Sequence, residues 1–300
     1  MGDRSAIEWT EATWNPVTGC SKVSPGCTNC YAERLSLRFG WSKHPWSAAH
    51  AAENVVLHPE RLDRPLRWRR PRMIFTCSMG DLFHERVPFE FVSRVFQIMD
   101  ACRQHTFQIL TKRPERMADW FAATKVEGPD FTGLAAVSMP DSMFTTLTDA
   151  WPLPNVWLGT SVEDQRRADE RIPHLLRCPA AVRFLSAEPL LGAIDLGRAC
   201  SCGYYCDESV GHVDHPFWTP GHATPIHWVI AGGESGPGSR PCELEWLRSI
   251  RDQCAAAGVP FFLKQLGGHP NKRGHDDALL DGRLWRDMPQ AAAGERGVAP

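Results

Sequence analysis

Short apolar runs, each followed by polar residues, recur along this chain and constrain its fold more than any other feature. Six of them are rich in β-branched and aromatic residues: Met73 to Cys77, Phe107 to Thr111, Val156 to Ser161, Val182 to Ser186, His227 to Ala231 and Val259 to Leu263. Continuous apolar runs bounded by turn residues are typical of strands covered on both faces. Another strand is expected at Thr13 to Val17, just before Cys20.

Two of the intervening segments, 88–103 and 243–257, carry apolar residues at helical spacing. Strands that alternate with helices predict βαβ units and a parallel sheet. About seven strands are one short of a complete eight-stranded barrel. We therefore predict an α/β fold, a partial or distorted (β/α) barrel with about six to seven parallel strands, and keep a doubly wound sheet as the alternative.

The length of 300 residues and the hydrophobic content of 43% are enough to bury one large core. We expect a single partial barrel over residues 1–268, interrupted by an insertion at 198–225 and followed by a polar C-terminal tail at 269–300. The insertion is interpreted as a second metal site, for zinc, or as an ordinary surface loop. Its potential ligands lack standard zinc-finger spacing and are Cys200, Cys202, Cys206, His212, His215 and His222.

Polar residues follow every predicted strand. A polar residue after a strand is often only a helix cap, so each case alone has a structural explanation. Polar residues at the ends of all seven strands favour a ligand site, because successive loops of α/β folds converge at the C-terminal ends of the strands. The residues are Cys20, Ser78, Asp81, Lys112, Arg113, Ser161, Glu163, Glu188, Gly232, Gly233, Glu234, Lys264 and Gln265.

Three cysteines in one short loop after the first strand, Cys20, Cys27 and Cys30, predict a metal centre. Three thiolates can hold three irons of a four-iron cluster and leave one iron open to another ligand. A structural zinc site wants four ligands, and the nearest histidine is His44, so the fourth would come from afar. A disulfide framework is disfavoured because the cysteine count, 11, is odd and no signal peptide precedes the loop. A catalytic thiol without a metal also stays open, although nothing nearby identifies its base.

The net charge of −2 and the pI near 6.6 argue against global steering toward nucleic acid. A local stripe remains, in which Trp68 is interleaved with Arg61, Arg64, Arg67, Arg69, Arg70 and Arg72. It is interpreted either as a surface that neutralises phosphates and stacks a base or as a solvated loop pinned by Trp68. No apolar run approaches the roughly 18 residues of a membrane span, so we expect a soluble cytoplasmic protein without a membrane partner.

Seven motifs, in order, resemble a known family. They are WNPVTGC with GCTNCYAE, CSMGDLFHE, ILTKRPERM, VWLGTSVEDQ, FLSAEPLLGAI, WVIAGGESGPGSRP and FFLKQLGG, and they cover nearly all of residues 7–268 outside the insertion. The resemblance is to the phage-associated three-cysteine-motif family, whose members are similar to radical S-adenosylmethionine proteins. It implies a [4Fe-4S] cluster at the open rim, with S-adenosylmethionine chelating the unique iron. An electron donor would then drive cleavage to a 5′-deoxyadenosyl radical that abstracts hydrogen from an unidentified substrate.

The same resemblance assigns roles to individual residues. Cys20, Cys27 and Cys30 match the cluster ligands, and the cofactor-binding set is Ser78, Asp81, Ser161, Glu163, Gly232, Gly233 and Glu234. Lys112, Glu188 and Lys264 are the candidates for catalysis. A likeness to radical enzymes that repair DNA lesions favours DNA or RNA as the substrate. The alternative is a non-catalytic iron–sulfur or zinc-binding protein that acts as a redox sensor or a nucleic-acid-binding module.

Overall fold

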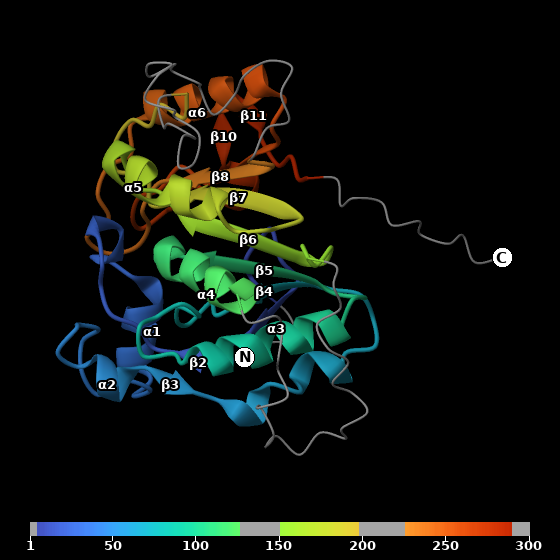
Figure 1. Cartoon of the computed structure of the whole chain (residues 1–300). Helices are drawn as coiled ribbons and strands as arrows, with labels where there is room; N and C mark the ends of the chain where they lie inside the picture. Colours follow the sequence, from blue (N-terminus) through green and yellow to red (C-terminus); the bar gives the residue numbers. More distant parts are fainter. Residues whose placement is uncertain (1–4, 127–150, 198–225, 290–300) are drawn as a thin grey trace, which may run out of the picture.

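The computed structural model describes residues 5–126, 151–197 and 226–289. Its centre is a seven-stranded parallel sheet, curled into a half-barrel with helices along its outer face (Figure 1). The predicted α/β partial barrel is therefore confirmed. In spatial order the strands are β1 (Ala12–Trp14), β4 (Met73–Thr76), β5 (Thr106–Thr111), β6 (Val156–Ser161), β7 (Val182–Ala187), β8 (Trp228–Gly232) and β9 (Phe261–Gln265).

The spatial order of the strands follows their order in the chain, which explains the curl. Each connection steps to the next neighbour in the same direction, so right-handed crossovers place the helices on one face. The helices are α1 (Tyr31–Arg38), α2 (Ala51–Asn54), α3 (Phe89–Ala101), α4 (Pro114–Val126), α5 (Gln165–Leu176) and α6 (Leu244–Ala257). Buried side chains of α3 to α6 pack on outward-facing strand residues such as Ile109, Leu158 and Leu263.

Aromatic side chains fill the inner face of the half-barrel near the N-terminal ends of the strands. They form a hydrophobic cluster separate from the one between the sheet and the helices, with Trp9, Trp157, Phe184 and Trp228 at its centre. The indoles of Trp9 and Trp228 meet edge to face at 6.1 Å. Gly159 makes room for it, because a Cβ there would lie 2.5 Å from the ring of Phe184. The inner surface therefore stays open only toward the C-terminal ends of the strands.

The first predicted strand, Thr13 to Val17, divides into two elements at Asn15 and Pro16. β1 belongs to the barrel sheet, whereas β2 (Val17–Thr18) pairs antiparallel with β3 (Val56–Leu57). Proline lacks the N–H that a continuous ladder needs. The residues that lead into the cysteines are therefore turned away from the sheet.

The chain beyond residue 268 packs against the barrel instead of forming a separate tail, up to residue 289, where the described part ends. β10 (Leu279–Leu280) and β11 (Arg283–Leu284) form a hairpin, and bridges join Phe262 to Arg286 and Gln265 to Gly274. This segment covers the edge strand β9, which would otherwise expose an unpaired row of backbone groups. The expected boundary at residue 268 thus falls inside the packed structure. None of the helices in the described ranges has the length and apolar character to cross a membrane.

Candidate functional site

The cysteine loop, residues 19–30, lies at the C-terminal rim of the sheet, where its path is fixed by close backbone contacts. Gly19 has φ +80°, and its N–H donates to the Met79 carbonyl at 2.8 Å. A Cβ on Gly19 would lie 1.7 Å from the Asn54 carbonyl oxygen, so only glycine fits here. The residue before Cys20 is thereby pinned between the loop after β4 and the end of α2.

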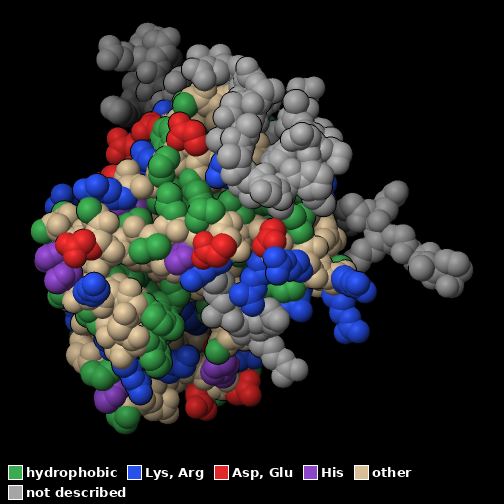
Figure 2. Space-filling view, turned by 90° about the horizontal axis from the view of Figure 1, so that it is seen from below, with side chains coloured by type: hydrophobic (Ala, Val, Ile, Leu, Met, Phe, Trp, Pro, Cys, Tyr) green, Lys and Arg blue, Asp and Glu red, His purple; other side chains and the backbone are tan. Residues whose placement is uncertain are grey.

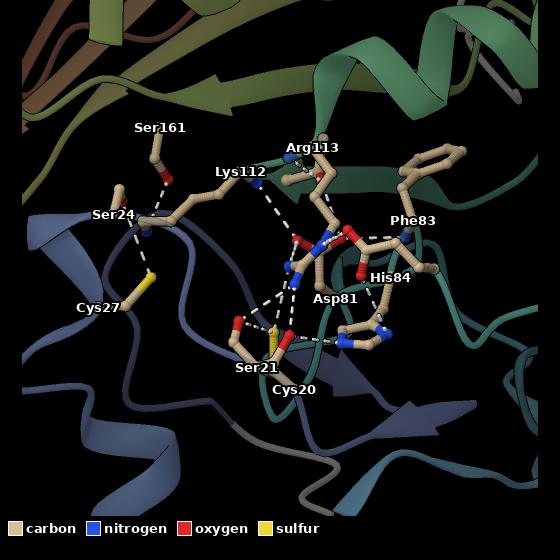
Figure 3. Close-up of polar contacts among 12 residues, drawn as sticks. Cys20, Ser21, Ser24, Cys27, Asp81, Phe83, His84, Lys112, Arg113 and Ser161 are labelled. Atoms are coloured by element: carbon tan, nitrogen blue, oxygen red, sulfur yellow. Dashed lines mark hydrogen bonds and ion pairs between the residues drawn. The ribbon is translucent and has the colours of Figure 1, made fainter. Parts of the chain in front are cut away.

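Arg113, directly after β5, binds the start of the loop (Figure 3). Its guanidinium donates to the Cys20 sulfur at 3.4 Å and to the Ser21 carbonyl and hydroxyl at 3.1 and 3.0 Å. Ser21 Oγ also lies 2.9 Å from His84 Nε2. The arginine is itself buried and pairs with Asp81 at 3.2 Å. The position of Cys20 therefore depends on a buried charge pair.

Asp81 has its carboxylate occupied by protein donors. It accepts from Thr111 Oγ1 at 2.7 Å, from the Phe83 N–H at 3.0 Å and from Arg113. The resemblance assigns this residue to cofactor binding, but the structure places it beneath the cysteine loop as the anchor of Arg113. Ser78 likewise turns toward the protein, where its hydroxyl donates to Asn15 Oδ1 at 3.2 Å.

Glu163 holds the middle of the cysteine loop. Its side chain is fully buried, pairs with Arg171 of α5 at 2.8 Å and accepts from the Gly26 N–H at 3.2 Å. Burial raises the pKa of this carboxyl, but Arg171, Ser24, Lys112 and the Gly26 amide together bring it below its ordinary value. The carboxylate is thus kept ionised where it touches the residue before Cys27.

Glu234 fixes the end of the loop. It accepts from Asn29 Nδ2 at 2.9 Å, and Arg240 donates to both of its carboxylate oxygens. Arg240 also reaches the Pro25 carbonyl at 3.0 Å. The hydrogen bonds of Arg240 lower the pKa of Glu234 against the opposing effect of burial, which is the largest single cause. Three arginine–carboxylate pairs from three strand ends therefore position the cysteine loop.

All three cysteines of the loop are half-buried and unpaired. Their sulfurs do not all lie within 4.8 Å of one another, whereas sulfurs around one tetrahedral zinc lie roughly 3.8 Å apart for Zn–S bonds of about 2.3 Å. Burial, followed by the charge of Asp81, raises the pKa of Cys20 to about 12, and burial also raises the pKa of Cys30. A metal-free thiolate nucleophile is therefore not favoured at Cys20 or Cys30.

An open cavity of about 360 Å³ lies beside the loop on the inner face of the half-barrel. Trp9 and Phe75 line its lower part, and Cys30 opens onto it. Residues at the strand ends line part of it, namely Lys112, Ser161, Ser186, Glu188, Gly233, Glu234, Lys264 and Gln265. Most of the rim residues singled out from the sequence thus do converge on one cavity.

The catalytic candidates are among the residues that face this cavity. Lys112 Nζ lies 3.2 Å from Ser161 Oγ, and Lys264 Nζ forms an ion pair with Glu188 Oε1 at 2.6 Å. Gly233 lets the chain pass close to β9, because a Cβ there would lie 2.3 Å from the Leu266 carbonyl oxygen. Its neighbour Gly232 packs on Gln265.

Sequence reasoning missed Asn29, Arg171 and Trp9. Trp9 precedes the first strand and carries a buried indole N–H without a hydrogen-bond partner among the described residues. Asn29 and Glu234 are 205 residues apart, so no local pattern links them. The second predicted metal site, with Cys200, Cys202, Cys206, His212 and His215, lies outside the described residues.

The arginine-rich stripe does not present its tryptophan to a ligand. Trp68 is 8% exposed, lies against the Arg64 and Arg72 guanidiniums and meets His105 edge to face. Its ring therefore pins the loop, as the second interpretation expects. The face that carries this segment shows basic side chains beside acidic ones (Figure 2), which is not a single-sign surface.

The sequence model of a family described as "Protein of unknown function (DUF5131)" matches residues 4–289. The match includes the cysteine loop, the strand ends and the segment that covers β9. No curated protein and no solved structure matches the chain.

Proposed function

The chain belongs to this family of unknown function, and we propose that it is a radical S-adenosylmethionine-type enzyme. In this proposal Cys20, Cys27 and Cys30 bind one [4Fe-4S] cluster, and the cavity beside Cys30 binds S-adenosylmethionine. The observation that supports it is that the cysteine loop and the cavity are adjacent. A loop with three half-buried cysteines is held rigidly at the rim, and one of those cysteines opens onto a cavity of about 360 Å³.

The residues present fit a cluster of this kind. Three free, half-buried cysteines in one loop supply the three thiolates that would hold a cluster and leave one iron open. A cluster held by thiolates carries negative charge, and the Arg113 guanidinium donates a hydrogen bond to the Cys20 sulfur. Hydrogen bonds to cluster sulfurs are one of the means by which proteins set the reduction potential.

When bound, the cluster would supply the electron that cleaves the sulfonium of S-adenosylmethionine to a 5′-deoxyadenosyl radical. The chain's own residues would bind and orient S-adenosylmethionine and shield it from water. Lys112, held by Ser161, would offer an ammonium to the carboxylate of the ligand, and the Glu188–Lys264 ion pair also lines the cavity. The aromatic lower part, with Trp9 and Phe75, excludes water from that end of the cavity.

The partners implied are an electron donor and a substrate, for which nucleic acid is the proposed class. That class rests on the resemblance to lesion-repairing radical enzymes and not on the arginine-rich stripe, whose tryptophan is buried.

The cluster is tested by anaerobic reconstitution with iron and sulfide. We expect a brown protein with about four irons per chain, and loss of most of the iron in Cys27→Ala. The matched control is Cys242→Ala, since Cys242 is another half-buried free cysteine, outside the loop. Stoichiometric zinc without iron uptake, or equal iron loss in both variants, would contradict the cluster.

S-adenosylmethionine binding is tested by thermal shift on the loaded protein. A ligand that binds only the folded chain at about 100 times its Kd stabilises it by about 2.7 kcal/mol, and we expect a much smaller shift for Cys27→Ala. Formation of 5′-deoxyadenosine after reduction supports the enzyme. A cluster-loaded protein that binds no S-adenosylmethionine and forms no 5′-deoxyadenosine would instead be the redox-sensing iron–sulfur protein.

A further inference from the structure

Two histidines and a glutamate gather at the surface of the segment that joins α1 to α2. His44 Nε2 lies 3.2 Å from Glu53 Oε2, and His50 Nδ1 lies 3.8 Å from Glu53 Oε1. The three ligand atoms all lie within 4.8 Å of one another, and no other group of this kind occurs in the described ranges. None of these residues lines the cavity beside the cysteines.

We propose that His44, His50 and Glu53 form a second metal site, for a divalent transition ion such as Zn²⁺. Two imidazoles and one carboxylate are an established ligand set for zinc. With Zn–N and Zn–O bonds of about 2.0–2.2 Å, tetrahedral ligands lie roughly 3.4 Å apart. The two imidazole nitrogens lie 3.2 and 3.8 Å from different oxygens of the Glu53 carboxylate, and one ligand atom from each of the three residues lies within 4.8 Å of the other two. A fourth position would remain for water, because all three side chains are partly exposed.

The ligands are brought together by the local structure. His50 is the residue directly before α2, and Glu53 follows three residues later, so both project from the same side of this helical turn. The rings of His44 and His50 are stacked, with centroids 4.3 Å apart and an interplanar angle of 13°. Stacking keeps the two imidazoles close together, and a turn of one ring about its side-chain torsions would bring both rings onto one ion, because a bound metal lies in the plane of each imidazole.

The loop that carries His44 is anchored on both sides. The Trp46 ring is buried, its indole N–H donates to Ser42 Oγ at 3.0 Å, and its backbone N–H donates to Glu33 Oε1 at 2.8 Å. The Asn54 side chain donates to the Pro45 carbonyl at 3.1 Å. The backbone that carries His44 is therefore held in place by these contacts, and the main entropy lost on binding an ion is that of the three ligand side chains.

Exposed histidine–carboxylate pairs also form without a metal, and this chain contains such a pair for comparison. His275 Nδ1 lies 3.3 Å from Glu8 Oε1, and its side chain is exposed like those of His44 and His50. Within the described parts of the chain, the His275 pair has no third ligand within reach, whereas the His44 group has one. The third ligand is what distinguishes a chelating site from an ion pair.

The position of the site gives it a structural role. Asn54, the residue after Glu53, has its carbonyl oxygen against Gly19, the residue before Cys20. A metal that crosslinks the loop to α2 would brace the support on which the cysteine loop rests. The side chains of His44, His50 and Glu53 are 42%, 40% and 59% exposed, so an ion could enter from solvent.

The experiment measures zinc retained by the full-length chain after equilibration with ZnCl₂ and desalting, with His275→Ala as the control. We expect His44→Ala and His50→Ala each to retain one zinc per chain less than wild type, and His275→Ala to match wild type. Zinc held by cysteines is common to all variants and cancels in the difference. The apparent Kd should rise by at least about 100-fold, beyond the 10–100-fold typical of losing an outer-shell partner.

Cobalt supplies a second readout. The part of the Co²⁺ spectrum that is lost in His44→Ala should contain d–d bands without a thiolate-to-metal charge-transfer band, because the ligands are nitrogen and oxygen. Glu53→Gln, which keeps the shape of the side chain, should also weaken retention. Equal zinc retention in wild type, His44→Ala and His50→Ala would overturn the proposal, and so would a thiolate band in the lost component.

Discussion

Replacing Glu163 with glutamine removes one charge from the most deeply buried ion pair of the rim. Glu163 is fully buried, and its partner Arg171 has only 8% of its side chain exposed. Breaking a buried pair by removing one partner costs about 3–5 kcal/mol, because the other charge is left uncompensated. Arg171 would keep its hydrogen bond to the Ser161 carbonyl at 2.8 Å, so we expect the lower end, about 3 kcal/mol.

The assay is urea unfolding of the cluster-free protein. The control is Glu170→Gln on α5, which removes an exposed carboxylate that pairs with Arg166 at 2.7 Å. Exposed ion pairs of this kind contribute little to the free energy of unfolding. The urea midpoint of Glu170→Gln should therefore stay close to that of wild type. Equal midpoints for Glu163→Gln and Glu170→Gln would refute the assignment of Glu163 as a buried anchor.

The pH dependence of the same comparison follows from the lowered pKa of Glu163. A carboxyl whose pKa is lower in the folded than in the unfolded chain stabilises fully above its ordinary value of 4.5. That contribution is lost as the pH falls through the lowered value, where the acid is protonated. The difference in unfolding free energy between wild type and Glu163→Gln should therefore be constant from pH 7 to 5 and shrink below pH 4.5.

Three further outcomes are expected. Gly159→Ala should destabilise the fold by about 1–3 kcal/mol in urea, because overpacking forces the Phe184 ring to shift. Arg240→Gln should speed iron loss to a chelator and also lower the unfolding midpoint, since it removes the hydrogen bond to the Pro25 carbonyl and leaves the buried Glu234 carboxylate without its arginine. Lys112→Gln should weaken the S-adenosylmethionine thermal shift at full iron content, because Lys112 faces the cavity and not a cysteine sulfur.

The sheet was predictable because its strands are buried on both faces. Every residue of β6 is buried, and the run Val156–Ser161 begins with three large apolar residues and has no charged residue, a pattern typical of a strand covered on both faces. The segment that covers β9 has no such signal. It contacts the edge through backbone bridges at Gly274 and Arg286, and backbone pairing places little demand on side-chain type. Its packing could not be read from hydrophobicity.

The convergence of polar residues at the rim was predictable as well, but the role of each residue was not. Along β5 the side chains alternate, so Leu110 and Lys112 face the cavity while Thr111 and Arg113 turn to the loop and to Asp81. This alternation could have predicted from the sequence that Lys112 and Arg113 face opposite sides. No local pattern predicts the contact between Glu163 and Gly26, which lies 137 residues earlier in the chain.

Some charged residues at the rim support the cysteine loop and others face the cavity, and their ion-pair partners distinguish the two groups. Asp81, Glu163 and Glu234 are each matched by an arginine and each support the cysteine loop, so their charge is already neutralised within the protein. Lys112 differs, since its ammonium is held by the Ser161 hydroxyl, a neutral group, at 3.2 Å. A carboxylate in the cavity would therefore gain a charge-assisted contact from Lys112 without breaking any pair that positions the cysteines. Ligand binding and loop support can thus be changed separately by mutation, which is why Lys112→Gln should leave the iron content unchanged whereas Arg240→Gln should lower it.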